Sequence, residues 1–171
     1  MATAVARNGH EVIVLSRSEE ISTGINEQHK NLKYLTEFEL LPNISSTCVA
    51  ATALRGCDFI IHSVPVRLFF AHPTRNLQPS IFKTAFLLSY HKYQVQASLQ
   101  YLSDRRGDIP PHVPIVSTSK GLHSDFLLTM NEIIPRALER DQPCAFLSGP
   151  SFAKDIMKDM PTAVVVARFK L

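Results

Sequence analysis

The chain has 171 residues, of which 45% are hydrophobic and 19% are charged, with 18 Lys and Arg against 15 Asp and Glu. This composition is that of an ordinary globular protein, so it excludes a disordered chain and a collagen-like repeat. No apolar run approaches the roughly 20 residues of a membrane-spanning helix, so we expect no membrane partner. One domain is the default at this length.

The cysteines, the histidines and the net charge argue against three further features: disulfides, a metal site and a nucleic-acid partner. Cys48, Cys57 and Cys144 lack C-x-x-C spacing, and the histidines lack metal-ligand spacing, so we expect neither disulfides nor a metal and favour a reducing compartment. The net charge of +3 arises from residues 66–94, which hold four Lys and Arg and no Asp or Glu. The rest of the chain is nearly neutral, so we expect no nucleic-acid partner.

The first quarter of the chain predicts helix, strand and helix. Residues 1–8 have the pattern of the last turns of a helix, and Gly9 is suited to its left-handed C-terminal cap. Residues 11–15 contain the β-branched run of a buried strand. Ser18 is a typical N-cap for the next helix, because two glutamates follow it in the first turn.

The remaining elements continue the alternation. After a polar connection over residues 34–43, Thr47 is suited to cap a short helix that Gly56 stops. The later apolar runs predict strands at 58–64, 113–118, 144–147 and 162–167 and a helix at 124–139. Alternating helices and apolar strands predict an α/β protein with a doubly wound parallel sheet that is covered on both faces.

Ligands of open parallel sheets bind outside the carboxyl ends of the strands. Ser16 and Arg17 follow the first predicted strand. A dinucleotide-binding fold often has Asp or Glu at this place for the ribose of NAD, whereas Arg can accept the additional phosphate of NADP. A solvated arginine at a strand end is an equally good reading.

Two further strand ends carry candidate residues. The strand at 58–64 leads into the apolar turn His62-Ser63-Val64-Pro65, although proline also ends many strands only because it cannot donate a ladder hydrogen bond. The strand at 113–118 leads into Ser119-Lys120-Gly121, where the lysine can present its ammonium group to a phosphate or a carbonyl oxygen. A solvated lysine remains an alternative.

The fourth candidate is the string Ser148-Gly149-Pro150-Ser151-Phe152-Ala153. It follows a strand, and Pro150 is suited to the first position of a helix. Free backbone N–H groups and the Ser151 hydroxyl would then face an anion. A plain capped turn uses similar residues, but the complete string favours a functional role.

Several strings together resemble the NAD(P)-dependent glycerol-3-phosphate dehydrogenase family. They are A-R-N-G-H-E-V (6–12), I-N-E-Q-H-x-N-x-K-Y-L (25–35), L-P-N-I (41–44), S-V-P (63–65), S-K-G (119–121), L-S-G-P-S-F-A (147–153) and P-T-A-V-V-V-A (161–167). The order and spacing agree except over residues 66–94. The resemblance implies an incomplete Rossmann-type sheet and hydride transfer between NAD or NADP and the pair dihydroxyacetone phosphate and sn-glycerol 3-phosphate.

The resemblance also implies roles for individual residues. Arg17 and Tyr34 would flank the adenosine end of the cofactor, Pro65 its middle, and Lys120 both nicotinamide and substrate. The implied cofactor-binding residues are Ser16, Arg17, Tyr34, Pro65, Lys120 and Ala153, and the implied substrate-binding residues are Lys120, Gly149 and Ser151.

The chain departs from the family pattern in three places. We expect residues 1–171 to be the N-terminal domain without its first strand and glycine loop, which would lie centrally, next to the second and fourth strands of the sheet. The family's helical domain with its proton-transfer lysine would follow, so the catalytic residue is unknown and we expect this chain alone to be inactive. Residues 66–94 fit a translated intron, because joining Pro65 to Val95 restores the family's strand-to-helix passage.

Other functions stay open. A non-catalytic remnant, or a module that binds nucleotides or another protein, is the alternative from a different class. A second alternative is another two-domain dehydrogenase, but the string S-G-P-S-F-A argues against it. We expect a cytoplasmic protein, with the plastid as an alternative, and a homodimer in the full-length enzyme.

Overall fold

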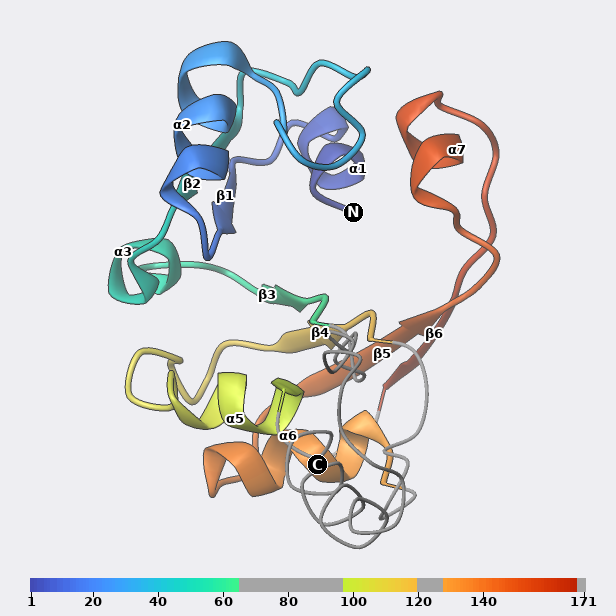
Figure 1. Ribbon diagram of the computed structural model, residues 1–171. Helices are drawn as coiled ribbons and strands as arrows, with labels where there is room; N and C mark the ends of the chain where they lie inside the picture. The colour runs from blue at the N-terminus through green and yellow to red at the C-terminus, as the bar shows by residue number, and fades with distance from the viewer. Residues whose placement is uncertain (65–96, 120–127, 169–171) are drawn as a thin grey trace, which may run out of the picture. The chain divides into compact units, whose positions relative to one another are not determined.

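The structure is a computed structural model that describes residues 1–64, 97–119 and 128–168. Predictions that fall on 65–96 and 120–127, including Pro65, Lys120 and the segment 66–94, lie outside the described residues. Helices and strands alternate (Figure 1) in the order α1 (Ala2–Arg7), β1 (Val12–Leu15), α2 (Glu19–Gln28), β2 (Ile44–Thr47), α3 (Ala50–Leu54), β3 (Ile60–His62), α5 (Ala97–Ser103), β4 (Ile115–Ser117), α6 (Met130–Leu138), β5 (Cys144–Ser148), α7 (Ala153–Met157) and β6 (Val165–Arg168).

The strands form two sheets. β1 pairs with β2 in parallel, and the second sheet has the order β3-β4-β5-β6, in which β3 pairs with β4 and β4 with β5 in parallel. The predicted α/β class with parallel strands is confirmed, and the sheet that we expected to be incomplete is present in two pieces. Among the described residues, β1 pairs only with β2.

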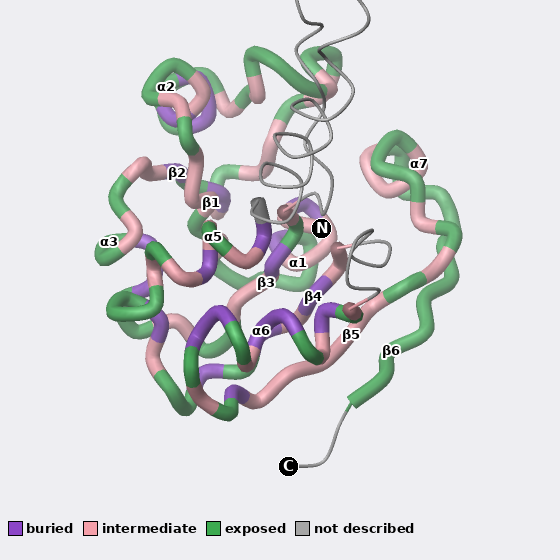
Figure 2. The backbone as a smooth tube through the Cα atoms, turned by 60° about the horizontal axis from the view of Figure 1, so that its bottom comes forward, coloured by how far each residue is buried: buried purple, intermediate pink, exposed green. Residues whose placement is uncertain are grey.

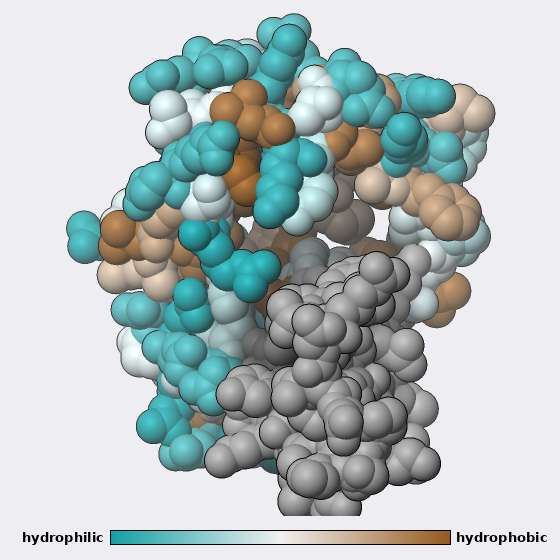
Figure 3. All heavy atoms as spheres, in the orientation of Figure 1, coloured by the Kyte–Doolittle hydropathy of each residue, from teal (hydrophilic) through white to brown (hydrophobic). Residues whose placement is uncertain are grey.

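One compact unit comprises Met1–Cys57 and Ser148–Val165. Its core is a cluster of Ala6 from α1, Ile25 from α2 and Ile44 from β2. Around this cluster pack partly buried apolar residues from α1, β1, α2 and the loop before β2, namely Ala2, Val12, Val14, Ile21, Leu40 and Leu41. Both predicted helix caps are confirmed. Gly9, which follows α1, has a φ of 83°, and the Ser18 hydroxyl caps α2 because it accepts from the backbone N–H of Ile21. Hydrophilic side chains gather over α2 in Figure 3.

The strand β2 was not predicted. Its residues read Ile-Ser-Ser-Thr, and only Ile44 carries an apolar side chain, yet Ile44 and Ser46 face inward in strict alternation. The prediction of Thr47 as a helix N-cap is wrong, because Thr47 ends this strand and Val49 is the N-cap of α3. A strand with so little apolar surface gives no periodic signal, since its stability comes from partners in the folded chain.

The second compact unit comprises Asp58–Leu147 and Val166–Leu171. The core residues come mainly from α6, β4 and the loop before β4, and include Leu102, Ile109, Val113, Ile115, Met130, Ile133, Ile134, Ala137 and Leu138. Figure 2 shows this buried stripe along α6. Ser103 in α5 donates to the carbonyl oxygen of Ala137 at 3.1 Å, which joins the two helices.

Two predicted boundaries need correction. The helix predicted from 124 begins at Met130, because Thr129 and Glu132 form a reciprocal capping box that fixes the first turn there. The last strand is β6, which begins three residues later than predicted and is exposed along its length (Figure 2). Within the described ranges, no helix combines the length and the apolar character that crossing a bilayer requires.

Candidate functional site

The turn after β1 is closed by its own serines. Ser16 Oγ accepts from the backbone N–H of Ser18 at 3.1 Å, and the Ser16 backbone N–H donates to the Thr47 carbonyl at 2.9 Å. Arg17 lies between these serines, is exposed and makes no ion pair with any described residue. Its guanidinium group is therefore available to a phosphate or carboxylate ligand.

Tyr34 presents its ring to solvent. Asn31 Oδ1 accepts from the backbone N–H groups of Lys33 at 3.0 Å and Tyr34 at 2.9 Å, which builds a tight turn at this point. The Tyr34 residue is 61% exposed, and Lys33 Nζ lies 5.6 Å from the centre of the ring. No hydrogen bond or ring contact joins Tyr34 to Arg17 in the described part of the chain, so the structure does not bring these two predicted residues together.

Gly149 is enclosed by backbone on one side. A Cβ atom at this position would collide with the carbonyl oxygen of Ala163 and lie 2.9 Å from the Cα atom of Val164. Only glycine therefore allows the two segments to approach so closely. The backbone N–H of Ser151 donates to the Gly149 carbonyl at 2.9 Å, which bends the chain directly after the strand β5.

The helix α7 begins later than the sequence indicates. The prediction of Pro150 as the first helical residue is wrong, because Phe152 is the N-cap and Ala153 the first residue of α7. The bend between Gly149 and Ser151 separates strand from helix and delays the first helical turn. Ala153 is exposed at the start of this helix, as a residue that contacts a ligand must be.

Arg7 was missed by the sequence reading although it fixes α7. Its guanidinium donates to the carbonyl oxygens of Ile156 at 2.6 Å and Met157 at 2.8 Å and pairs with Asp159 at 2.9 Å. These carbonyls belong to the last turn of α7, where the negative end of the helix dipole favours a cation, and the Ile156 carbonyl also accepts from the backbone N–H of Asp159 at 3.2 Å. The only sequence feature that could have indicated this role of Arg7 is its place as a basic residue in the last turn of α1.

The carboxyl ends of β3 and β4 meet at His62. The imidazole Nδ1 lies 3.1 Å from Ser119 Oγ, which itself donates to the Val64 carbonyl at 2.6 Å. Burial lowers the pKa of His62 to about 4, so the ring is neutral near pH 7. The predicted residues Pro65 and Lys120 are next to Val64 and Ser119 in the sequence and lie outside the described residues.

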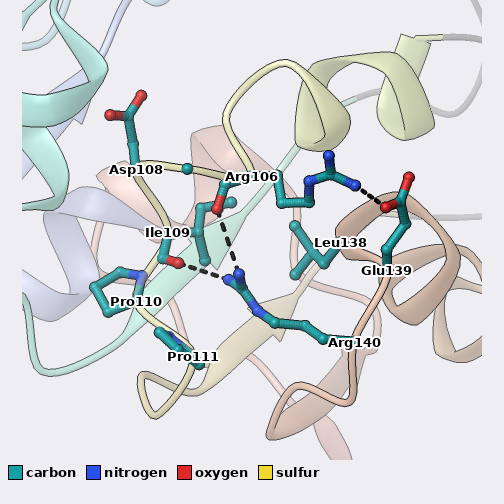
Figure 4. Close-up of a pocket in the computed structure, with 9 residues that line it drawn as sticks. Arg106, Asp108, Ile109, Pro110, Pro111, Leu138, Glu139 and Arg140 are labelled. Carbon is teal, nitrogen blue, oxygen red and sulfur yellow. Dashed lines mark hydrogen bonds and ion pairs between the residues drawn. The ribbon is translucent and has the colours of Figure 1, made fainter.

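An open pocket of about 590 Å³ lies elsewhere (Figure 4). Residues 106–111, in the loop that precedes β4, and residues 138–140, at the end of α6, line it. Arg106 pairs with Glu139 across it, and Arg140 donates to the carbonyl oxygens of Arg106 at 3.4 Å and Ile109 at 2.5 Å. Both segments precede strands, whereas ligand sites of parallel sheets follow them, so this pocket is a structural feature of the amino ends.

The described residues contain no cluster of His, Cys, Asp and Glu with the geometry of a metal site. The candidate residues that can reach a ligand offer hydroxyls, backbone amides and the Arg17 guanidinium. Such groups bind and orient an anionic ligand.

Comparison with known proteins identifies relatives along the whole chain. The chain is 38% identical over 160 residues to a chloroplastic glycerol-3-phosphate dehydrogenase (NAD+) of Oryza sativa, an alignment that covers 92% of this chain and 29% of the relative. A glycerol-3-phosphate dehydrogenase (NAD(P)+) of Myxococcus xanthus is 32% identical over 169 residues, with 98% of this chain and 42% of the relative covered. The chain thus spans between 29% and 42% of the length of these curated relatives.

Solved structures agree in fold. The chain superposes on glycerol-3-phosphate dehydrogenase from Coxiella burnetii with a TM-score of 0.69 at 22% identity, covering 96% of this chain and 41% of that one. The corresponding enzyme from Saccharomyces cerevisiae gives a TM-score of 0.68 at 20% identity, with 99% and 44% covered. A family model for the NAD-dependent glycerol-3-phosphate dehydrogenase N-terminus matches residues 1–105 and 93–170. The chain therefore belongs to this family, which confirms the resemblance that the sequence strings indicate.

Proposed function

We propose that this chain is the cofactor-binding part of an NAD(P)-dependent glycerol-3-phosphate dehydrogenase. In that role it holds NAD or NADP while hydride passes between the nicotinamide and the C2 carbon of dihydroxyacetone phosphate and sn-glycerol 3-phosphate. The family match over residues 1–105 and 93–170 carries the proposal. The cofactor supplies the hydride chemistry, and the protein supplies binding and orientation.

The turn after β1 is suited to the adenosine end of the cofactor. Ser16 and Ser18 fix the turn, and the free guanidinium of Arg17 projects from it. The exposed ring of Tyr34 offers a flat surface for the adenine. Arg17 in place of an acidic residue supports the use of NADP as well as NAD, since an arginine can pair with the additional phosphate.

The segment after β5 is suited to the substrate end. Gly149 keeps the backbone free of a side chain where two segments approach closely, and Ser151 brings a hydroxyl next to it. Ala153 would contact the cofactor from the start of α7. Pro65 and Lys120 complete the proposed set, with Lys120 touching both nicotinamide and substrate.

The whole reaction needs more than these residues. We propose that proton transfer depends on a lysine in the helical domain of the longer family members, so that these 171 residues bind the cofactor without turnover. The single pairing of β1 supports a sheet that lacks its first strand. The reading of 66–94 as an insertion is part of the same proposal, because joining Pro65 to Val95 restores the strand-to-helix passage of the family.

The proposal extends to the compartment and to the assembly of the complete enzyme. The plant relatives are named as chloroplastic, which supports the plastid beside the cytoplasm as the compartment. A homodimer of the complete enzyme is part of the same proposal. The alternative function is a module that binds nucleotides or another protein and takes no part in the dehydrogenase reaction.

A fluorescence titration of the 171-residue chain with NADH and NADPH tests the proposal. We expect saturable binding of both cofactors and no oxidation of sn-glycerol 3-phosphate. Arg17→Ala should weaken NADPH more than NADH, because only NADPH carries the phosphate that the guanidinium can pair with. Arg55→Ala is the matched control at an exposed arginine in the same unit. Absence of binding by either cofactor would favour the alternative function.

A further inference from the structure

His62 and Ser119 connect the ends of two neighbouring strands. His62 is the last residue of β3 and pairs in register with Ser117 of β4, and Ser119 lies two residues after that partner. The distance from Nδ1 to Ser119 Oγ is 3.1 Å. The backbone N–H of Thr118 also donates to the His62 carbonyl at 2.9 Å, so the side-chain contact extends the strand pairing beyond the last ladder position.

The direction of the hydrogen bond follows from the serine. Ser119 Oγ has a single proton, which it donates to the Val64 carbonyl at 2.6 Å, because a carbonyl oxygen can only accept. The same oxygen must therefore accept from His62, so Nδ1 carries the imidazole proton. Nε2 is then the unprotonated nitrogen, and it has no hydrogen-bond partner within the described ranges. A buried acceptor without a donor is tolerated better than a buried N–H without an acceptor.

The side chains that form this hydrogen-bond network are buried or half-buried. His62 is 3% exposed, and the Val64 carbonyl accepts a second, longer hydrogen bond from the buried hydroxyl of Ser98 in α5 at 3.5 Å. The Val64 carbonyl, two residues after β3, is thus held by Ser119, two residues after β4, and by Ser98 of α5. Because His62 and Ser98 are buried while Val64 and Ser119 are half-buried, water has restricted access to these hydrogen bonds, and each bond constrains the backbone more than a fully exposed one does.

We propose that His62 is a positioning residue of the cofactor-binding edge, which acts through its Nδ1–H to hold Ser119 on the Val64 carbonyl. The chain of contacts fixes the separation between the backbone after β3 and the backbone after β4. Both segments continue directly into residues that the proposed function assigns to the cofactor, so the inference rests on that function. His62 itself touches no ligand.

Two substitutions separate positioning from packing. His62→Asn keeps an N–H donor at nearly the place of Nδ1 but leaves part of the ring volume empty, whereas His62→Leu fills the volume without a donor. A residue that only fills the core would favour leucine. A positioning residue favours asparagine, and Ser119→Ala should behave like His62→Leu because it removes the other partner of the same bond.

The test is the dissociation constant for NADH of the full 171-residue chain, measured with the melting temperature of each variant. We expect His62→Leu and Ser119→Ala to weaken NADH about tenfold, the equivalent of one hydrogen bond, and the double variant to be no weaker than either single one. His62→Asn should bind within about twofold of the unmodified chain. Ser103→Ala is the matched control, since it removes one serine hydrogen bond from the same unit and should leave NADH binding unchanged.

The outcomes distinguish the two proposals. If the unmodified chain binds NADH and His62→Leu binds it equally well, or better than His62→Asn, the positioning role is overturned while the proposed function stands. If the unmodified chain binds no NADH, both are overturned. The nitrogen chemical shifts of the His62 imidazole test the bridge without a ligand, because they must show the proton on Nδ1, and a proton on Nε2 would contradict the bridge.

Discussion

The side-chain amide of Asn26 in α2 pairs with both backbone polar groups of Ser46 in β2. Its Nδ2 donates to the Ser46 carbonyl at 2.9 Å, and its Oδ1 accepts from the Ser46 N–H at 2.7 Å. The amide thus occupies the outer edge of β2 as a further strand would, and it shields an edge that could otherwise pair with another chain. The buried Ser46 hydroxyl adds a hydrogen bond to the Val14 carbonyl at 2.9 Å.

Replacing Asn26 should destabilise the first unit. Asn26→Ala leaves a backbone donor and acceptor of Ser46 without their partner, so we expect the free energy of unfolding to fall by about 2 kcal/mol. Asn8→Ala is the control, because Asn8 makes a single exposed hydrogen bond to the Ala4 carbonyl and should change stability by less than about 1 kcal/mol. Urea denaturation measures both values, and equal losses would contradict the role of Asn26.

Arg7 should control the order of α7. Arg7→Ala removes three hydrogen bonds to the last turn of α7 and to Asp159, so we expect the amides of this helix to exchange with solvent about tenfold faster. Hydrogen exchange read by mass spectrometry checks this. Arg55→Ala, at an exposed arginine of the same unit, should leave the exchange of α7 unchanged. Unaltered exchange in Arg7→Ala would show that α7 is held by other contacts.

His62 should make stability depend on pH. Burial lowers its pKa from the usual 6.5 to about 4, so between these values the unfolded chain binds a proton that the folded chain does not. Its contribution is therefore complete above pH 6.5 and is lost as the pH falls toward about 4, by at most about 3 kcal/mol. The difference in free energy of unfolding between the unmodified chain and His62→Asn should shrink over this range. A difference that stays constant would mean that His62 titrates normally in the folded chain.

Gln142 should hold the loop before β4. It is 2% exposed, accepts from Arg140 Nε at 3.0 Å and donates to the carbonyls of Pro110 at 3.0 Å and Val113 at 2.5 Å. Gln142→Ala leaves these groups unsatisfied, so we expect a loss of about 2 to 4 kcal/mol in the free energy of unfolding. The exposed residue Gln100 provides the control, and Gln100→Ala should cost less than about 1 kcal/mol. If Gln142→Ala and Gln100→Ala lower the free energy of unfolding equally, the buried amide of Gln142 does not hold the loop.

Local signals in the sequence predicted most elements. Ser18 acts as an N-cap, Gly9 has a positive φ, and the β-branched run at 12–14 forms a strand, because each depends on neighbours within a few residues. β2 was not predicted, because the backbone N–H of Ser46 at its edge is paired by Asn26, a residue 20 positions away in the sequence. Tertiary partners of this kind leave no periodic trace in the sequence.

The sequence predicts a position for the candidate site but not its geometry. The rule that ligands bind after parallel strands directs attention to Ser16, Arg17 and the strings at 62–65 and 119–121, and their role in ligand binding stays a prediction. The sequence could not show that His62 turns inward to Ser119, since that depends on the register of β3 against β4. The start of α7 was also misplaced, because the bend at Gly149 is imposed by the backbone of Ala163.

We propose that the carboxyl ends of the strands bind a nicotinamide dinucleotide. Hydrogen exchange of the 171-residue chain with and without NADH is the decisive measurement of this binding. We predict slower exchange on NADH addition at residues 16–18, 117–119 and 149–153, which follow β1, β4 and β5, and no change at residues 106–111 around the pocket. Protection confined to the pocket, or no protection anywhere, would contradict the claim.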